Sequence, residues 1–127
     1  MKDVIEYIVF YGTLCQTKVR KELNIDDSLI YISPCTLSGS LYDLGDYPGL
    51  ILNTTQTITA ELYKIKNMDC LNILDDYEDY HPDYISDSLY IRRTIHLPTF
   101  NCLSWIYEYN QKVTPEQLVI NGEWKIK

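Results

Sequence analysis

The amino-acid sequence predicts an α+β fold in which a curled mixed sheet is flanked by short helices. Several runs rich in β-branched and aromatic residues end at glycine, proline or asparagine, as strands of small sheets do. Helices are expected only over residues 18–23 and after Lys66, where apolar residues recur at spacings of three and four. The 127 residues contain no internal repeat or low-complexity linker. We therefore expect a single domain over residues 1–127.

About six strands are expected along the chain. The first, residues 5–11, has an almost continuously apolar second half, which indicates a central strand with both faces covered. Between residues 29 and 44 we expect strands interrupted by Pro34 and Gly39, and then a turn over residues 42–49. The remaining predicted strands cover residues 57–65, 89–97 and 102–109.

The first predicted strand runs into the segment Tyr11-Gly12-Thr13-Leu14. A strand that stops at a glycine and turns toward a short helix leaves backbone amides without partners. Such amides form a concavity suited to a carboxylate or a developing oxyanion. Gly12 would let the backbone approach a ligand closely, and Thr13 would add a hydroxyl donor. A tight turn without a ligand is the alternative interpretation.

The helix predicted after Lys66, which Asn67 would cap, ends in four acids within five positions. We expect these acids to raise one another's pKa, so that one of them can transfer a proton. Glu78 follows Leu71 by seven positions and Leu74 by four, which places it on the buried stripe of the helix. The other acids are expected off that stripe: Asp75, Asp76 and Asp79. A solvated acidic helix end is the alternative.

Aromatic residues in the last two predicted strands are candidates for a pocket wall. Alternation puts Tyr90 and Arg92 on one face, and Trp105 and Tyr107 on one face of the next strand. They could serve as core aromatics, or the tyrosines could offer hydroxyls around an apolar cleft. Arg92 is expected to pair with a nearby acid.

The composition disfavours several function classes. Eleven basic against 18 acidic residues give a formal net charge of −7, which would repel phosphate backbones and anionic lipid surfaces. We therefore expect neither nucleic acid nor a membrane as partner. No apolar run approaches the roughly 20 residues that span a bilayer. The first residues lack the pattern of a signal peptide, so a cytoplasmic location is expected.

The four cysteines are scattered without a C-x-x-C pair, and neither His81 nor His96 has a second ligand at metal spacing. We therefore expect no metal site. Cys15 is the cysteine closest to the predicted anion-binding segment, but a nucleophilic role would require a base beside it.

Taken in order, these segments resemble the γ-glutamylcyclotransferase-like superfamily, in its AIG2-like and γ-glutamylamine cyclotransferase branch. The resemblance extends over nearly the whole chain, although each motif is modest by itself. The matching pieces are Val9-Phe10-Tyr11-Gly12-Thr13-Leu14, Gly39-Ser40-Leu41-Tyr42-Asp43-Leu44-Gly45, Tyr47-Pro48-Gly49-Leu50, Glu61-Leu62-Tyr63, Leu74-Asp75-Asp76-Tyr77-Glu78, Tyr90 with Arg92, Trp105-Ile106-Tyr107 and Gly122-Glu123-Trp124.

The resemblance implies a small β-barrel-like mixed sheet with short flanking helices and a cavity at one end. It also implies a γ-glutamyl cyclotransferase reaction on a small-molecule γ-glutamyl substrate, without a cofactor. The α-amine of the γ-glutamyl group attacks its own γ-carbonyl, which forms 5-oxoproline and releases an amine. The family's catalytic glutamate falls on Glu78. The family's glutamyl-binding loop falls on Tyr11, Gly12, Thr13 and Leu14, and Tyr90 and Tyr107 are further candidates for substrate binding.

Two departures from the family pattern bear on this expectation. The family commonly has glycine after the catalytic glutamate, where this chain has Asp79, and Ala60 stands where glycine often precedes Glu-Leu-Tyr. Aspartate tolerates a positive φ better than most residues, which would preserve the turn. The alternatives are a non-catalytic ligand-binding or interaction domain of the same fold, and an amidase that hydrolyses its substrate.

Overall fold

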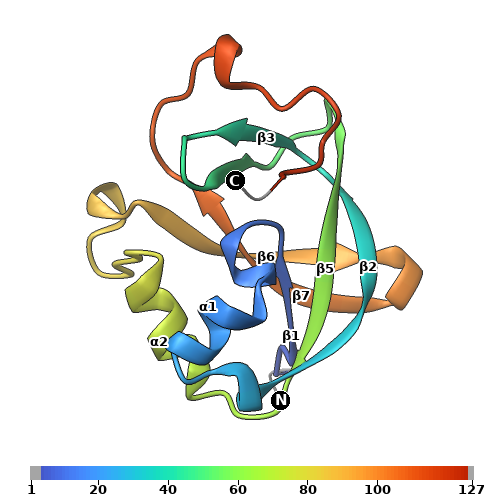
Figure 1. Cartoon of the computed structure of the whole chain (residues 1–127), viewed down its shortest axis with the longest axis vertical. Helices are drawn as coiled ribbons and strands as arrows, with labels where there is room; N and C mark the ends of the chain where they lie inside the picture. Colours follow the sequence, from blue (N-terminus) through green and yellow to red (C-terminus); the bar gives the residue numbers. More distant parts are fainter. Residues whose placement is uncertain (1–3, 126–127) are drawn as a thin grey trace.

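The computed structural model describes residues 4–125, and Figure 1 shows its arrangement. The strands are β1 (Tyr7–Phe10), β2 (Leu29–Ser38), β3 (Ser40–Asp43), β4 (Pro48–Ile51), β5 (Thr57–Ile65), β6 (Tyr90–Leu97) and β7 (Cys102–Tyr109). The α-helices are α1 (Thr17–Glu22) and α2 (Cys70–Tyr77). The 3-10 helices are η1 (Thr13–Cys15), η2 (Asp26–Ser28), η3 (Ile85–Asp87), η4 (Pro98–Phe100) and η5 (Pro115–Gln117).

Five strands form one mixed sheet in the order β2-β5-β1-β7-β6. The β1–β7 pair is parallel, and the other pairs of this sheet are antiparallel. β3 and β4 form a second, two-stranded sheet, and both α-helices lie on one side of the long strands (Figure 1). The predicted α+β class with a mixed sheet and few short helices is confirmed.

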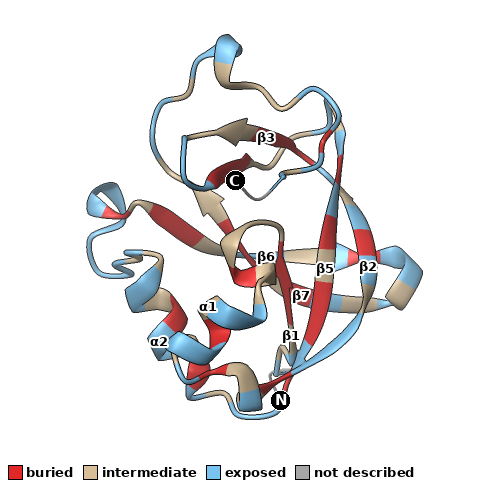
Figure 2. Cartoon of the chain, in the orientation of Figure 1, coloured by how far each residue is buried: buried red, intermediate tan, exposed pale blue. Residues whose placement is uncertain are grey.

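Strand β1 is central and covered on both faces, as its apolar sequence predicted. Ile8 and Phe10 point into a hydrophobic cluster that includes Leu74 of α2, whereas Val9 points into a second cluster that includes Leu50 of β4. All five side chains are buried (Figure 2). Alternate residues of one short strand therefore join the two cores. This arrangement anchors the end of β1, where the predicted anion-binding segment begins.

The prediction that Pro34 interrupts a strand is wrong. β2 continues through Pro34, which lies opposite Glu61 of β5, and the register shifts instead between Tyr31 and Ser33. β2 lies at the edge of the sheet and has a neighbouring strand on one side only. A strand in this position tolerates proline, because not every backbone amide is needed for pairing. The predicted break at Gly39 is correct, because β2 ends before it and β3 begins after it.

Helix α2 begins and ends close to the predicted positions, but its N-cap is Asp69 and not Asn67 as predicted. The side chain of Asn67 instead accepts a hydrogen bond from the amide of Asp69 at 3.0 Å, in the turn that precedes the helix. At the other end, the amide of Glu78 still bonds to the carbonyl of Leu74 at 2.8 Å, and Asp79 then turns the chain with a φ of 56°. Glu78 is thus the C-cap residue of α2, and the amides of Asp79 and Tyr80 close the turn on the carbonyls of the last helical turn.

The last two strands pair as a hairpin from Tyr90 opposite Tyr109 to Leu97 opposite Cys102. The two strands predicted over residues 89–97 and 102–109 are confirmed, and this register joins them in one hairpin. Across residues 4–125, no helix is long and apolar enough to cross a membrane.

Candidate active site

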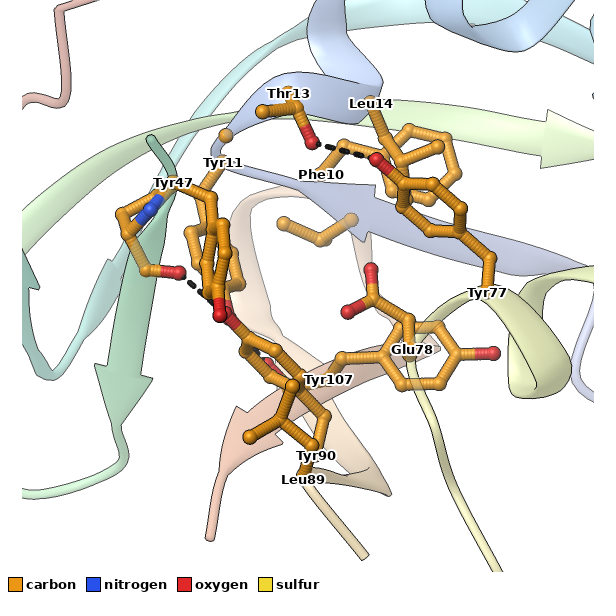
Figure 3. A pocket seen from close by; sticks show the side chains of 13 residues that line it. Phe10, Tyr11, Thr13, Leu14, Tyr47, Tyr77, Glu78, Leu89, Tyr90 and Tyr107 are labelled. Carbon is orange, nitrogen blue, oxygen red and sulfur yellow. Dashed lines mark hydrogen bonds between the residues drawn. The ribbon is translucent and has the colours of Figure 1, made fainter. Parts of the chain in front are cut away.

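A cavity of about 280 Å³ lies at the end of β1, between the end of α2 and the strands β4, β6 and β7. It is open on one side, and apolar and aromatic side chains form most of its wall (Figure 3). Its lining residues are Val9, Phe10, Tyr11, Gly12, Thr13, Leu14, Tyr47, Pro48, Tyr77, Glu78, Leu89, Tyr90 and Tyr107. All seven residues that the sequence singled out as site candidates therefore line one cavity.

Glu78 is the charged group of this cavity. Its carboxylate points into the enclosed space (Figure 3), and within residues 4–125 it makes no hydrogen bond or ion pair. Burial raises the pKa of Glu78 from 4.5 to about 8. The neighbouring acids do not contribute to this rise, so the expectation that they raise the pKa of Glu78 is wrong. The cause is the loss of water around the carboxylate, which disfavours its charged form.

Asp75 contradicts the prediction that it lies off the buried stripe. Its side chain is only 17% exposed, and both of its oxygens accept hydrogen bonds from Arg92, at 2.8 and 3.0 Å. The hydroxyl of Tyr107 donates a third hydrogen bond to Asp75 at 2.6 Å. Position 75 borders the stripe one helical turn after Leu71, and a cation from β6 neutralises the carboxylate there. The predicted pairing of Arg92 with a nearby acid is confirmed.

Arg92 also stacks over the ring of Trp105, with 4.3 Å between the guanidinium carbon and the ring centroid. Arg92, Trp105 and Tyr107 thus share the face of the β6–β7 hairpin that meets α2, as the alternation pattern predicted. Through Asp75, this face holds the end of α2 in place. The last helical turn, and with it Glu78, is therefore tied to the sheet by charge-assisted hydrogen bonds.

Two tyrosines, the buried Tyr90 and the partly buried Tyr11, complete the inner wall. The hydroxyl of Tyr11 donates to the carbonyl oxygen of Tyr107 at 2.6 Å, and the hydroxyl of Tyr90 donates to the carbonyl oxygen of Pro48 at 2.7 Å. Burial is the main cause that raises the pKa of both phenols above the ordinary value, so they stay neutral. At the rim, a hydrogen bond of 3.2 Å joins the hydroxyls of Thr13 and Tyr77 (Figure 3).

The segment after β1 passes into η1, and the amide of Cys15 bonds back to the carbonyl of Gly12 at 3.0 Å. The first amides of such a helix have no partner within it, and the residues that carry them, Gly12, Thr13 and Leu14, line the cavity. A Cβ on Gly12 would stand 2.7 Å from the ring of Pro48, which requires glycine at this position. The backbone of the segment therefore approaches β4 as closely as glycine permits.

Behind this segment, Arg20 performs a structural task that the sequence analysis missed. Its guanidinium donates to the carbonyl of Leu14 at 2.8 Å, to the hydroxyl of Tyr63 at 3.1 Å and to the carboxylate of Asp26 at 2.9 Å. Arg20 is 7% exposed, although it belongs to a six-residue helix in which Val19 is the only apolar residue. No periodic signal marks one buried arginine in so short a helix.

Comparison with known proteins shows which family has a similar sequence. The family described as "Gamma-glutamyl cyclotransferase, AIG2-like" matches residues 8–126. The chain belongs to this family. A protein of Vibrio cholerae named "Putative gamma-glutamylcyclotransferase" is 30% identical over 121 residues, which cover 94% of this chain and 96% of that protein. Membership suggests cyclotransferase chemistry on a small molecule.

Solved structures share the fold of this cyclotransferase-family chain. The solution structure of ytfP from Escherichia coli has a TM-score of 0.69 at 24% identity and covers 93% of this chain and 95% of its own. The crystal structure of the uncharacterized protein PH0828 from Pyrococcus horikoshii has a TM-score of 0.66 at 12% identity, with 93% and 88% covered. At these identities the likeness concerns the fold.

Asp79 and Cys15 each follow a residue that lines the cavity, Glu78 and Leu14 respectively. Asp79, where the cyclotransferase family commonly has glycine, adopts a φ of 56°, so the tight turn after Glu78 is kept. Cys15 lies beside Glu61; burial is the first cause that raises the pKa of its thiol, and a hydrogen bond with Glu61 adds to it. Its thiol is therefore neutral. Residues 4–125 contain no cluster of three potential metal ligands.

Proposed function

We propose that this chain is a γ-glutamyl cyclotransferase that acts on a γ-glutamyl amine or a related amide. The α-amine of the substrate attacks its own γ-carbonyl, and the products are 5-oxoproline and a free amine. The observation that carries this proposal is Glu78: a carboxyl group with a pKa of about 8 that points into the cavity and has no partner within residues 4–125. Such a group can both accept and return a proton near neutral pH.

In this proposal the glutamyl head binds at the segment Tyr11-Gly12-Thr13-Leu14. Amides at the start of η1 would donate to the α-carboxylate or to the oxyanion that forms at the γ-carbon. The rings of Tyr90 and Tyr107 form the apolar wall along which the methylene groups of the substrate would pack. Arg20 would fix the position of this segment through its hydrogen bond to the carbonyl of Leu14.

The proposed reaction is balanced without an added nucleophile. Glu78 takes one proton from the α-ammonium, and the resulting amine forms a C–N bond with the γ-carbon. The oxyanion then collapses, the bond to the leaving nitrogen breaks, and Glu78 returns its proton to that nitrogen. The second proton of the attacking nitrogen also leaves with the released amine, which departs as an ammonium. Because the ring closure is intramolecular, the protein mainly orients the substrate and moves protons.

The decisive experiment compares the unmodified protein with Glu78→Gln. Both are incubated with γ-glutamyl-ε-lysine, γ-glutamyl amino acids, glutathione and γ-glutamyl polyamines, and 5-oxoproline is measured by mass spectrometry. We expect Glu78→Gln to fold and to lose on the order of 10²–10⁴-fold in turnover. Asp76→Asn, on the exposed side of the same helix, is the matched control and should keep its activity.

Each contrary result has a distinct meaning. Full turnover by Glu78→Gln would show that another group is the acid/base residue. Release of glutamate in place of 5-oxoproline would identify a hydrolase. Ligand binding with no product from any member of the panel would identify a binding domain of the same fold.

A further inference from the structure

The hydroxyls of Tyr11 and Tyr90 each donate their single hydrogen to a backbone carbonyl oxygen, at 2.6 and 2.7 Å. A carbonyl oxygen carries no hydrogen, so the phenol must be the donor in both contacts. What remains on each phenol oxygen is lone-pair capacity, which on Tyr11 is shared with the backbone amide of Leu50. Toward a ligand, both phenols are therefore acceptors.

These two oxygens share one electrostatic environment with Glu78. The phenols of Tyr11 and Tyr90 and the carboxyl group of Glu78 line the same cavity (Figure 3), and the charge of Glu78 is among the causes that raise the pKa of both phenols. Because burial keeps both phenols neutral, they do not become anions that repel the carboxylate. Among the described residues that line the cavity, Glu78 is the only charged one, and no lysine or arginine competes for it. When Glu78 is ionised, this part of the wall consists of hydrogen-bond acceptors.

On the basis of the proposed function, we infer that Tyr11 and Tyr90, together with Glu78, form the binding site for the free α-ammonium group of the substrate. An ammonium has three N–H donors and no acceptor, so it matches two phenol oxygens and one carboxylate. Once Glu78 has removed a proton, the two remaining N–H groups stay on the tyrosines. The nitrogen lone pair is then free to attack the γ-carbonyl. The two tyrosines thus select a free α-amine and orient it.

This arrangement predicts discrimination against ligands without that amine. A ligand that lacks the ammonium would bury the two phenol oxygens and the carboxylate without donors, which is the arrangement that proteins use to reject an analogue lacking a polar group. An N-acylated ligand would supply only one N–H and would add bulk at the crowded inner wall. The requirement concerns the α-amino group and does not depend on which amine leaves.

The test measures equilibrium binding by calorimetry in the Glu78→Gln background, where the γ-glutamyl ligand is not consumed. The two probes are γ-glutamyl-n-butylamide and its des-amino analogue, glutaric acid mono-n-butylamide. We expect the amino ligand to bind at least about tenfold more tightly, and Tyr90→Phe or Tyr11→Phe to lower that ratio by about fivefold each. Tyr109→Phe is the matched control: Tyr109 packs against Tyr90 at 5.3 Å but does not line the cavity, so the ratio should not change.

Two results would overturn the inference. The first is equal affinity for the two probes before any tyrosine is changed, a result that does not depend on the folding of a tyrosine variant. The second is an equal loss of affinity for both probes in the phenylalanine variants, which would mean that the hydroxyls only shape the cavity. Turnover to 5-oxoproline without selectivity would leave the proposed function standing and reject this inference. Selectivity without turnover would do the opposite.

Discussion

Two carboxylates on the same helix end, Asp75 and Glu78, differ completely in their surroundings. Asp75 accepts three hydrogen bonds, two from Arg92 and one from Tyr107. Glu78, three residues later, makes no hydrogen bond or ion pair within residues 4–125, and burial raises its pKa to about 8. Asp75, which has partners, connects α2 to strands β6 and β7. The carboxylate without a partner is the one that can exchange protons.

The two groups also depend on each other. Through Asp75 the end of α2 is fastened to β6 and β7, and this attachment determines where Glu78 points. A desolvated carboxylate without a partner costs folding free energy, and the molecule tolerates it because the neighbouring pair and the hydrophobic cluster that contains Cys70 and Leu74 hold the helix in place. Three predictions test this division of roles.

The largest effect is expected for Asp75→Asn. An asparagine can accept a hydrogen bond with its oxygen, but its amide group would face a donor of Arg92 and leave the guanidinium without its anion. We expect the free energy of unfolding to fall by about 3 kcal/mol, measured by urea denaturation. Turnover should fall as well, because the helix end that carries Glu78 loses its attachment.

The control for this change is Asp76→Asn, at an exposed position in the same helix turn. Its free energy of unfolding should stay within about 0.5 kcal/mol of the unmodified protein. Equal urea midpoints for Asp75→Asn and Asp76→Asn would show that the pair with Arg92 does not hold the helix, and the structural half of the comparison would fail.

The second prediction concerns the stability of Glu78→Gln. The pKa of Glu78 is about 8 in the folded protein and near 4.5 when the chain is unfolded, so between these values the folded state binds more protons. The free energy of unfolding of the unmodified protein should therefore decrease as the pH rises from about 4.5 to 8. Glutamine does not ionise, so the Glu78→Gln variant does not lose this part of its free energy of unfolding as the pH rises. We expect Glu78→Gln to be more stable at pH 9 by on the order of 2 kcal/mol, and nearly equal at pH 4.

Urea denaturation of both proteins at several pH values measures this difference. The two proteins should be compared at each pH, because the many other carboxylates that titrate at low pH contribute equally to both. A difference between the two proteins that stays constant from pH 4 to pH 9 would mean that Glu78 ionises as a solvated residue does. That result would remove the main support for its role as acid/base residue.

The contrast between the two carboxylates also shows what the sequence could and could not predict. Helical spacing placed Glu78 on the inner face, because its distance from Leu74 and Leu71 depends only on the helix. The same spacing assigned Asp75 to the outside, since it carries no information on Arg92, which arrives from a strand 17 residues later. Periodicity describes one element, whereas the partner of a polar group belongs to the tertiary structure.

The same distinction applies to the rest of the molecule. Apolar runs and turn residues report local structure. They were therefore sufficient to predict the central strand β1, the turn at Gly12 and the strands β6 and β7. The passage of β2 through Pro34 could not be predicted, because it depends on that strand lying at the sheet edge. Nor could the role of Arg20, whose hydrogen bonds reach residues from Leu14 to Tyr63.

The smallest effect is expected for Asp79→Gly, which restores the residue that the family commonly has after its glutamate. Asp79 has a φ of 56°, which glycine adopts more easily, and it pairs with His81 at 2.6 Å on the exposed surface. Surface pairs of this kind contribute little, so the backbone gain and the lost pair should nearly cancel. We expect the free energy of unfolding to change by less than about 1 kcal/mol.

The more informative measurement on Asp79→Gly is the pH dependence of kcat/KM, which reports the pKa of the base in the free enzyme. Burial is the cause that raises the pKa of Glu78, and Asp79 does not contribute to it. The rise of kcat/KM toward its half-maximum near pH 8 should therefore be the same in both proteins. If the variant instead shifts that midpoint to a lower pH, the adjacent charge does act on Glu78. The two carboxylates of the comparison would then differ by their charged neighbours rather than by access to water.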